Sequence, residues 1–204
     1  MGTKFSKLNI LEGWTSGNPD IYKFIKESKF GYDFLEWVPF DRFTDVREIG
    51  EGGFAKVYSA TWIDSKSNYY INDDGNYKKM EAKRKAVALR KLNESQNMPE
   101  KYLNELKIHW NLFKRSGLQF YGLTKESETK EFMMVLRFAN KGNLRNTSLS
   151  NDFNNFLWKD KIKLLRDSLT DLARLHKMGY FHSGNILRIN DYVSFIPYKK
   201  YVSG

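Results

Sequence analysis

The chain has 204 residues and no cysteine, 41% of its residues are hydrophobic, and its formal net charge at pH 7 is +10. This length and apolar content allow a hydrophobic core and exclude a wholly disordered chain, and without cysteine there is no disulfide, thiolate zinc site or cysteine nucleophile. No apolar run is long enough to cross a membrane and no secretory signal peptide is apparent, so we expect a cytoplasmic protein.

Residues 1–42 are expected to form an N-terminal extension. Within it, Ile21, Phe24 and Ile25 recur at helical spacing after Pro19, which predicts a short amphipathic helix over residues 20–29. The next stretch, residues 35–43, is rich in aromatic residues and interrupted by a proline.

Residues 43–142 carry a strand-rich pattern with one helix after the third strand. The helix is predicted at 99–113, and a polar loop precedes the third strand at 64–76. After Gly142 a second, long helix is predicted at 158–177. The strands are predicted at 43–49, 54–63, 86–92, 118–123 and 131–138. This order predicts an α+β fold with an antiparallel sheet followed by a helical part.

A glycine-rich segment, Ile-Gly-Glu-Gly-Gly-Phe-Ala-Lys-Val at residues 49–57, lies between the first two predicted strands. A dinucleotide fingerprint would run from strand into helix, and a P-loop would end in Gly-Lys-Ser or Gly-Lys-Thr, so neither matches. A glycine hairpin between strands can fold over phosphates and donate backbone N–H groups, because no Cβ blocks the approach. On the loop alone, an ordinary tight hairpin remains an equal alternative.

Further segments follow the loop in a fixed order. They are Val87-Ala88-Leu89-Arg90, the helix with Glu105, residues 133–139, Gly142-Asn143-Leu144 and His182-Ser183-Gly184-Asn185-Ile186-Leu187. Over about residues 15–196 the chain thereby resembles the protein kinases of the tyrosine-kinase-like group. Its lead-in Trp-Val-Pro-Phe-Asp-Arg-Phe at 37–43 resembles that of the expanded kinase families of mycorrhizal (glomeromycete) fungi.

The resemblance implies a protein-kinase-like fold. A five-stranded antiparallel N-lobe sheet with helix C would be followed by a truncated helical C-lobe. The division implied is an N-terminal extension at 1–42, a kinase N-lobe and hinge at 43–142, and an incomplete C-lobe at 143–204.

The resemblance also implies an ATP site beneath the glycine loop. Val57 and Ala88 would flank the adenine, Leu136 would be the gatekeeper, and the backbone of Phe138 and Ala139 would bind the adenine edge. Plain core packing of the three aliphatic side chains is compatible with these roles. The nucleotide-binding residues implied are Ile49, Gly50, Glu51, Gly52, Gly53, Phe54, Ala55, Val57, Ala88, Arg90, Glu105, Leu136, Phe138 and Ala139.

Arg90 stands where the family has the lysine that pairs with the phosphates and with the glutamate of helix C, here Glu105. Side chains alternate along a strand, so Arg90 is expected on the face of Ala88 and Lys91 on the opposite face. The planar guanidinium keeps the charge but is larger than an ammonium. We expect weaker positioning of the phosphates and retained nucleotide binding.

The catalytic motif is incomplete. The family's His-Arg-Asp-x-x-x-x-Asn supplies the Asp that accepts the substrate proton and an Asn that holds magnesium. Residues 179–187 read Gly-Tyr-Phe-His-Ser-Gly-Asn-Ile-Leu, which lacks that Asp and retains Asn185 as a metal position without its partner. His182 is a less favoured candidate for the base than for a packing role. No Asp-Phe-Gly follows, so magnesium binding is possible only at an incomplete site.

Four hypotheses remain open: an ATP-binding domain without phosphotransfer, an active Ser/Thr/Tyr protein kinase represented by an incomplete chain, a non-catalytic scaffold, and a truncated gene product. The helix at 158–177 would expose an apolar stripe of Ile162, Leu165, Leu169 and Leu172, which predicts a protein partner or self-association.

Other partners are less favoured. The basic residues at 78–85 are not accompanied by an aromatic-basic motif of an RNA-binding module, so nucleic acid is not expected. The start Met-Gly-Thr-Lys-Phe-Ser matches the myristoylation pattern, and membrane association is expected only if Gly2 is acylated.

Overall fold

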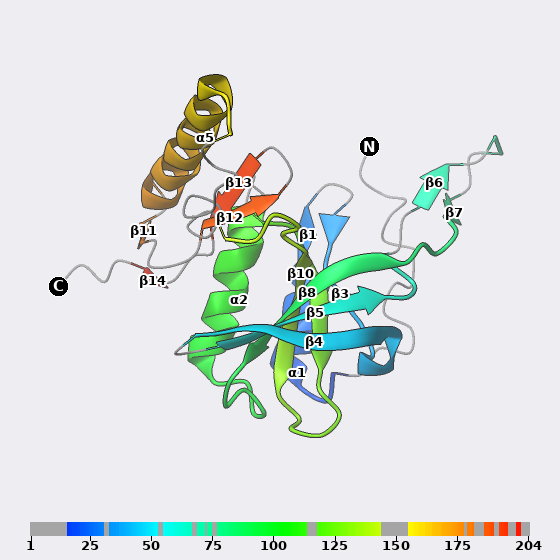
Figure 1. Cartoon of the computed structure of the whole chain (residues 1–204). Coiled ribbons are helices and arrows are strands. Elements are labelled where there is room, and N and C mark those ends of the chain that lie inside the picture. The colour runs from blue at the N-terminus through cyan, green and yellow to red at the C-terminus, as the bar shows by residue number, and fades with distance from the viewer. Residues whose placement is uncertain are drawn as a thin grey trace.

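The computed structural model describes residues 16–30, 33–52, 55–66, 69–71, 73–74, 77–113, 118–143, 155–177, 179–181, 186–189, 192–195 and 199–200. Its centre is a six-stranded sheet with helix α2 (Glu100–Phe113) beside it, while helix α5 (Trp158–Lys177) lies apart from the sheet at the upper left (Figure 1). Within that part of the chain, every helix is too short or too polar to span a lipid bilayer. The predicted α+β, kinase-like fold is confirmed.

The sheet has the strand order β3-β9-β10-β8-β5-β4, and every pairing is antiparallel except that of β3 with β9. The five predicted strands are all present, and β3 is a sixth that sequence patterns did not predict. A strand of two residues is too short to show the alternation of apolar and polar side chains from which strands are predicted. The strands are β3 (Glu36–Trp37), β4 (Phe43–Gly52), β5 (Ala55–Trp62), β8 (Lys85–Leu92), β9 (Phe120–Lys125) and β10 (Phe132–Arg137).

Helix α1 (Pro19–Glu27) confirms the predicted amphipathic helix. Asn18 caps it, because its side-chain oxygen accepts hydrogen bonds from the backbone N–H groups of Asp20 and Ile21 at 3.0 and 3.1 Å. Proline at the first helical position suits this start, where a missing N–H removes no helical hydrogen bond. The short elements that follow are β1 (Lys29–Phe30), β2 (Asp33–Phe34) and the 3-10 helix η2 (Phe40–Arg42).

Three more short strand pairs complete the described secondary structure. One of them, β6 (Tyr69–Ile71) with β7 (Tyr77–Lys79), occupies the loop predicted between the second and third strands. The others lie near α5 (Figure 1), and they pair β11 (Tyr180–Phe181) with β14 (Lys199–Lys200) and β12 (Ile186–Ile189) with β13 (Tyr192–Phe195).

Each face of the sheet carries its own buried hydrophobic cluster. On the α2 side, side chains of α1 and α2 pack with Phe120, Leu123 and Phe132 of the sheet. On the other side, Val87 and Leu89 of β8 pack with aromatic residues of neighbouring strands and of the lead-in, among them Trp62. Because successive side chains point to opposite faces, this division fixes the register of the central strand.

His109 of α2 is buried on the α2 side of the sheet, with 3% of its surface exposed and its ring edge-on to Phe120. Its Nε2 lies 3.9 Å from Oε1 of Glu105 and, within the described structure, makes no hydrogen bond. Burial, and then the positive charge of Arg90, lower the pKa of His109 from 6.5 to about 3. The ring is therefore neutral in the folded chain at physiological pH.

This pKa predicts a loss of stability on acidification. Between pH 6.5 and 3 the unfolded chain binds a proton at His109 that the folded chain does not, so stability falls as the pH falls. Lowering the pH from 7.5 to 5 should cost about 2 kcal/mol of unfolding free energy. Urea denaturation at both pH values measures this, and His109→Gln should remove most of the difference. An equal loss in the variant would assign it to other groups.

Candidate functional site

A pocket of about 500 Å³ opens beside the middle of the sheet. Its walls come from strands β4, β5, β8 and β10 and from the segment that leaves β10. The lining residues are Ile49, Gly50, Val57, Ala88, Arg90, Leu118, Leu136, Arg137, Phe138, Ala139, Asn140, Gly142, Asn143 and Leu187. Most of these side chains are apolar, and Arg90 and Arg137 supply positive charge.

The register of three adjacent strands brings the wall together. Val57 of β5 is paired with Arg90 of β8, and Ala88 of β8 is paired with Leu136 of β10. Ala88 and Arg90 therefore share a face, as predicted, while Val87 and Leu89 are fully buried on the other. An apolar wall and a guanidinium are thus set next to each other by strand pairing alone.

Most of the predicted nucleotide-binding residues meet at this pocket. Among the predicted residues whose side chains the structure describes, Glu51, Ala55 and Glu105 do not line it, while Gly52 ends β4 opposite Ala55. Glu51 instead forms an exposed ion pair with Lys56 at 3.5 Å, and Ala55 is buried opposite Leu92. Gly53, Phe54 and Asn185, together with the rest of the incomplete catalytic motif at 182–185, lie outside the described residues.

Several lining residues were not predicted as part of the site. Leu118 precedes β9, and no local pattern distinguishes it from an ordinary core leucine. Asn143 and Leu187 stand in the motifs that follow the glycine loop, and an isolated antiparallel bridge pairs them. This bridge brings Leu187 to the pocket, and the motifs gave the only sequence indication of it.

Arg90 and Glu105 form the ion pair predicted between β8 and α2. Nη1 of Arg90 donates a hydrogen bond to Oε1 of Glu105, and the two side chains are 12% and 23% exposed. The pair ties the helix to the sheet at the edge of the pocket. The pair also fixes the position of the guanidinium at the pocket wall. The carboxylate of Glu105 compensates part of the positive charge of Arg90.

The opposite face of β8 carries a second buried cation. Nζ of Lys91 lies 2.7 Å from Glu126 and 3.0 Å from Glu131. Burial lowers the pKa of Lys91, but hydrogen bonds to both carboxylates outweigh this and raise it above its ordinary value. Lys91 is therefore committed to a charged cluster away from the pocket, as its predicted orientation implied.

The donor set of the pocket suits an anion better than a metal ion. The described part of the lining contains two arginines and no carboxylate. Across the described residues, no three His, Cys, Asp or Glu side chains are grouped closely enough to hold a metal ion. Magnesium prefers carboxylate oxygens, so the described lining does not fit a magnesium site.

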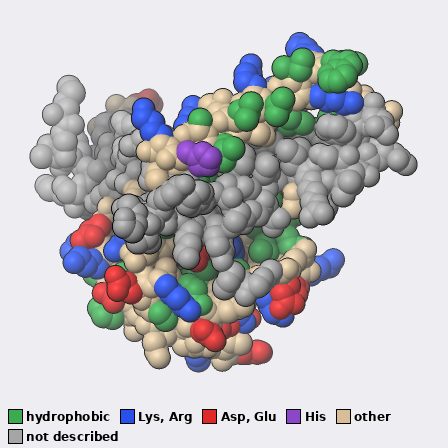
Figure 2. Space-filling view, turned by 90° about the vertical axis from the view of Figure 1, so that its left-hand side faces the viewer, with side chains coloured by type: hydrophobic (Ala, Val, Ile, Leu, Met, Phe, Trp, Pro, Cys, Tyr) green, Lys and Arg blue, Asp and Glu red, His purple; other side chains and the backbone are tan. Residues whose placement is uncertain are grey.

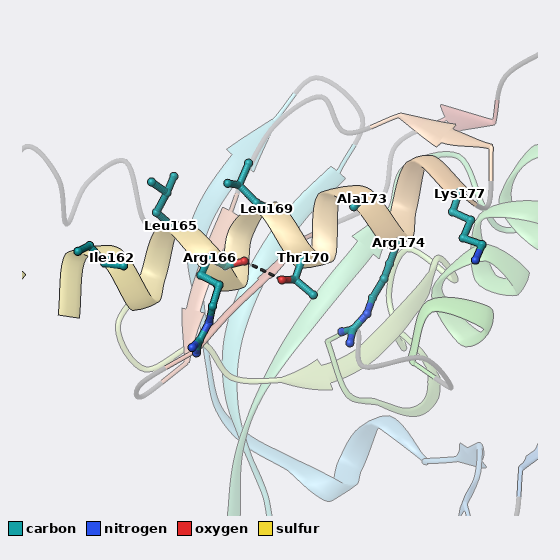
Figure 3. Close-up of a pocket in the computed structure, with 8 residues that line it drawn as sticks. All are labelled: Ile162, Leu165, Arg166, Leu169, Thr170, Ala173, Arg174 and Lys177. Carbon is teal, nitrogen blue, oxygen red and sulfur yellow. Dashed lines mark hydrogen bonds between the residues drawn. The ribbon is translucent and has the colours of Figure 1, made fainter. Parts of the chain in front are cut away.

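A second hollow, of about 650 Å³, runs along the outer surface of α5. Ile162, Leu165 and Leu169 project from the helix there (Figure 3) and are 56–61% exposed. Hydrophobic side chains interspersed with basic ones gather along the top of the space-filling view, at the height of α5 (Figure 2). Exposure of this predicted stripe is confirmed for these three residues.

Leu172 is a correction to that prediction. It is only half-exposed, because it packs beside the buried pair of Leu175 from α5 and Leu112 from α2. The sequence spacing places Leu172 on the stripe, and packing against the Leu112–Leu175 pair covers part of its surface.

Comparison with known proteins was consistent with this fold. The family model described as protein tyrosine and serine/threonine kinase matches residues 43–187. The chain is also similar to an L-type lectin-domain containing receptor kinase IX.2 of Arabidopsis thaliana, with 27% identity over 168 residues. The match covers 82% of this chain and 22% of the plant protein, so the chain spans about a fifth of that relative's length.

Glu105→Gln tests the ion pair at the pocket. The substitution leaves a largely buried guanidinium without its counter-charge, so we expect the free energy of unfolding to fall by about 2 kcal/mol in urea denaturation. Glu51→Gln is the matched control, because it breaks an exposed pair with Lys56 and should leave stability unchanged. Equal losses of unfolding free energy in the two variants would show that the Arg90–Glu105 pair stabilises the fold no more than an exposed pair does.

Proposed function

Since the chain belongs to the protein tyrosine and serine/threonine kinase family, we propose that its pocket binds ATP without transferring phosphate. The observation that carries the proposal is the pocket itself. Its apolar wall of Val57, Ala88 and Leu136 suits a purine ring, and Arg90 lies beside that wall where an anion can reach it.

The glycine loop would cover the phosphates. Gly50 lines the pocket, and a Cβ built on it would meet no atom within 4 Å. Its backbone therefore borders open space that a ligand can enter. Arg90, oriented by Glu105, would supply positive charge to the same end of the nucleotide. The adenine edge would be bound by the backbone of Phe138 and Ala139, as in the family.

Phosphate transfer needs a base for the substrate hydroxyl and ligands for magnesium. Residues 179–187 lack the family's Asp, and no carboxylate stands between Asp171 and Asp191 in the sequence. The described lining of the pocket offers none either. We therefore propose a pseudokinase, in which this chain's residues bind and orient the nucleotide and no proton acceptor completes the reaction.

Finer assignments belong to the same proposal. The lead-in at 37–43 supports membership of the tyrosine-kinase-like group, with likeness to the expanded kinase families of glomeromycete fungi. We keep the division into an extension at 1–42, an N-lobe with hinge at 43–142 and an incomplete C-lobe at 143–204. A cytoplasmic location is proposed on the sequence alone.

A non-catalytic scaffold is the second candidate. The exposed apolar stripe on α5 favours it, because a hydrophobic surface of this kind is typical of a protein contact. The two candidates are compatible, since the stripe and the pocket do not share residues.

ATP binding is tested by denaturation of the purified chain with and without 1 mM ATP. A dissociation constant near 1 μM would raise the free energy of unfolding by about 4 kcal/mol. We expect a similar gain in EDTA and in magnesium, because no described lining residue is a carboxylate. Ala88→Phe is the control, since its ring would fill the pocket and abolish the gain. A chain that ATP does not stabilise would leave the scaffold as the better function.

Arg90→Lys tests the phosphate end of the site. A lysine is the residue that the family uses there, so the substitution should tighten ATP binding several-fold in isothermal titration calorimetry. A radiolabelled phosphate assay should show no transfer from the lysine variant or from the unaltered chain. Turnover by the unaltered chain that Arg90→Ala abolishes would overturn the pseudokinase and support an active kinase.

A further inference from the structure

The N-terminal segment, described at residues 16–30 and 33–38 and called here the strap, precedes the part of the chain that matches the kinase family. It is nevertheless built into the same core. Ile21, Phe24 and Ile25 of α1 are at most 6% exposed, and they belong to one hydrophobic cluster with Leu106 and other residues of α2. Helix α1 contacts α2 directly.

The other end of the strap is fixed to the sheet. Strand β3 pairs in parallel with β9, with Glu36 opposite Gly122, and the backbone N–H of Val38 donates to the carbonyl of Leu123 at 2.8 Å. Trp37 adds an edge-to-face contact with Phe132, with ring centres 6.0 Å apart. One end of the strap is thus held by α2, and the other by strand β9 and by Phe132 of β10.

A buried serine connects the two ends. Oγ of Ser28 donates to the carbonyl of Ile25 at 2.6 Å and accepts from the backbone N–H of Leu35 at 3.2 Å. Ser28 is 1% exposed. The end of α1 is therefore linked through one buried side chain to the residue just before β3.

Gly122 shows how closely β3 approaches. A Cβ at this position would lie 2.0 Å from the carbonyl oxygen of Glu36 and 2.8 Å from its carbonyl carbon. These are backbone atoms, so no side-chain movement can relieve the clash. Gly122 is not among the glycines with positive φ, and its backbone conformation therefore does not demand glycine. Glycine is required here because the backbone of the strap lies too close to leave room for a Cβ.

Helix α2 carries the residue through which the strap can act on the pocket. Leu106 is fully buried in the cluster that α1 completes, and its neighbour Glu105 holds Arg90 at the pocket wall. A shift of α2 would move the Glu105 carboxylate relative to the guanidinium. The strength of the pair depends on this geometry, because a hydrogen-bonded charge pair weakens steeply with distance and angle.

We propose that the strap positions α2, and that through the Arg90–Glu105 pair it sets the nucleotide affinity of the pocket. Phe24 and Gly122 are then positioning residues for a site that neither of them touches. The inference rests on the proposed ATP binding, and it assigns to the N-terminal extension a role in that binding.

The test measures ATP affinity of the full chain by calorimetry for five variants. Phe24→Ala and Gly122→Ala should each weaken ATP binding about tenfold, within the range reached by coupling through packed side chains. Tyr22→Ala is the matched control, because Tyr22 lies on the same helix with 43% of its surface exposed. It should leave the affinity unchanged. Phe24→Ala keeps the test decisive if Gly122→Ala does not fold.

The last two variants, Glu105→Gln alone and Glu105→Gln combined with Phe24→Ala, separate positioning from plain stabilisation. In a Glu105→Gln background, Phe24→Ala should no longer weaken ATP binding, because the pair through which the strap acts is already lost, although it should still lower stability. An unchanged affinity in Phe24→Ala, or an equal loss in both backgrounds, would overturn the positioning role while ATP binding stands. Failure of the unaltered chain to bind ATP would instead overturn the proposed function, and this inference with it.

Discussion

The alternation of side chains along β8 is the constraint on which the rest of this structure depends. The strand lies between β5 and β10, and it directs Val87 and Leu89 into one core and Ala88 and Arg90 towards the pocket. A register slip of one residue would bury the guanidinium of Arg90 in the cluster that surrounds Leu89 and expose the leucine. The hydrophobic burial that stabilises the sheet therefore also fixes the position of the charge.

Arg90 and Lys91 are adjacent in sequence, but they lie on opposite faces of β8 and have different ion-pair partners. Lys91 is enclosed by Glu126 and Glu131, so its charge is already matched within the protein. Arg90 forms an ion pair with Glu105 and borders the pocket. Lys91 cannot take the place of the family's phosphate-binding lysine without leaving two buried carboxylates unpaired, which is costly. Of these two adjacent cations, the arginine is thus the one that borders the pocket and can reach a nucleotide.

Sequence patterns predicted what is local and repeated. The three helices and five strands carry clear periods, and the motif order located Val57, Ala88, Arg90 and Leu136 at one pocket. Contacts between distant segments were not predictable in this way. Strand β3 is defined by its pairing with β9 rather than by its own two residues. Leu172 follows the apolar stripe of α5 but packs beside α2.

The same distinction explains why the role of Gly122 could not be predicted from the sequence. A glycine inside a strand indicates a bulge or the close approach of another backbone, and only the structure shows that Glu36 is the backbone that approaches. The position of α2 depends on this approach, because the strap that β3 anchors ends in the helix packed on α2. The ion pair at the pocket is therefore supported from two sides, by the register of β8 and by a segment that lies before the kinase-like region.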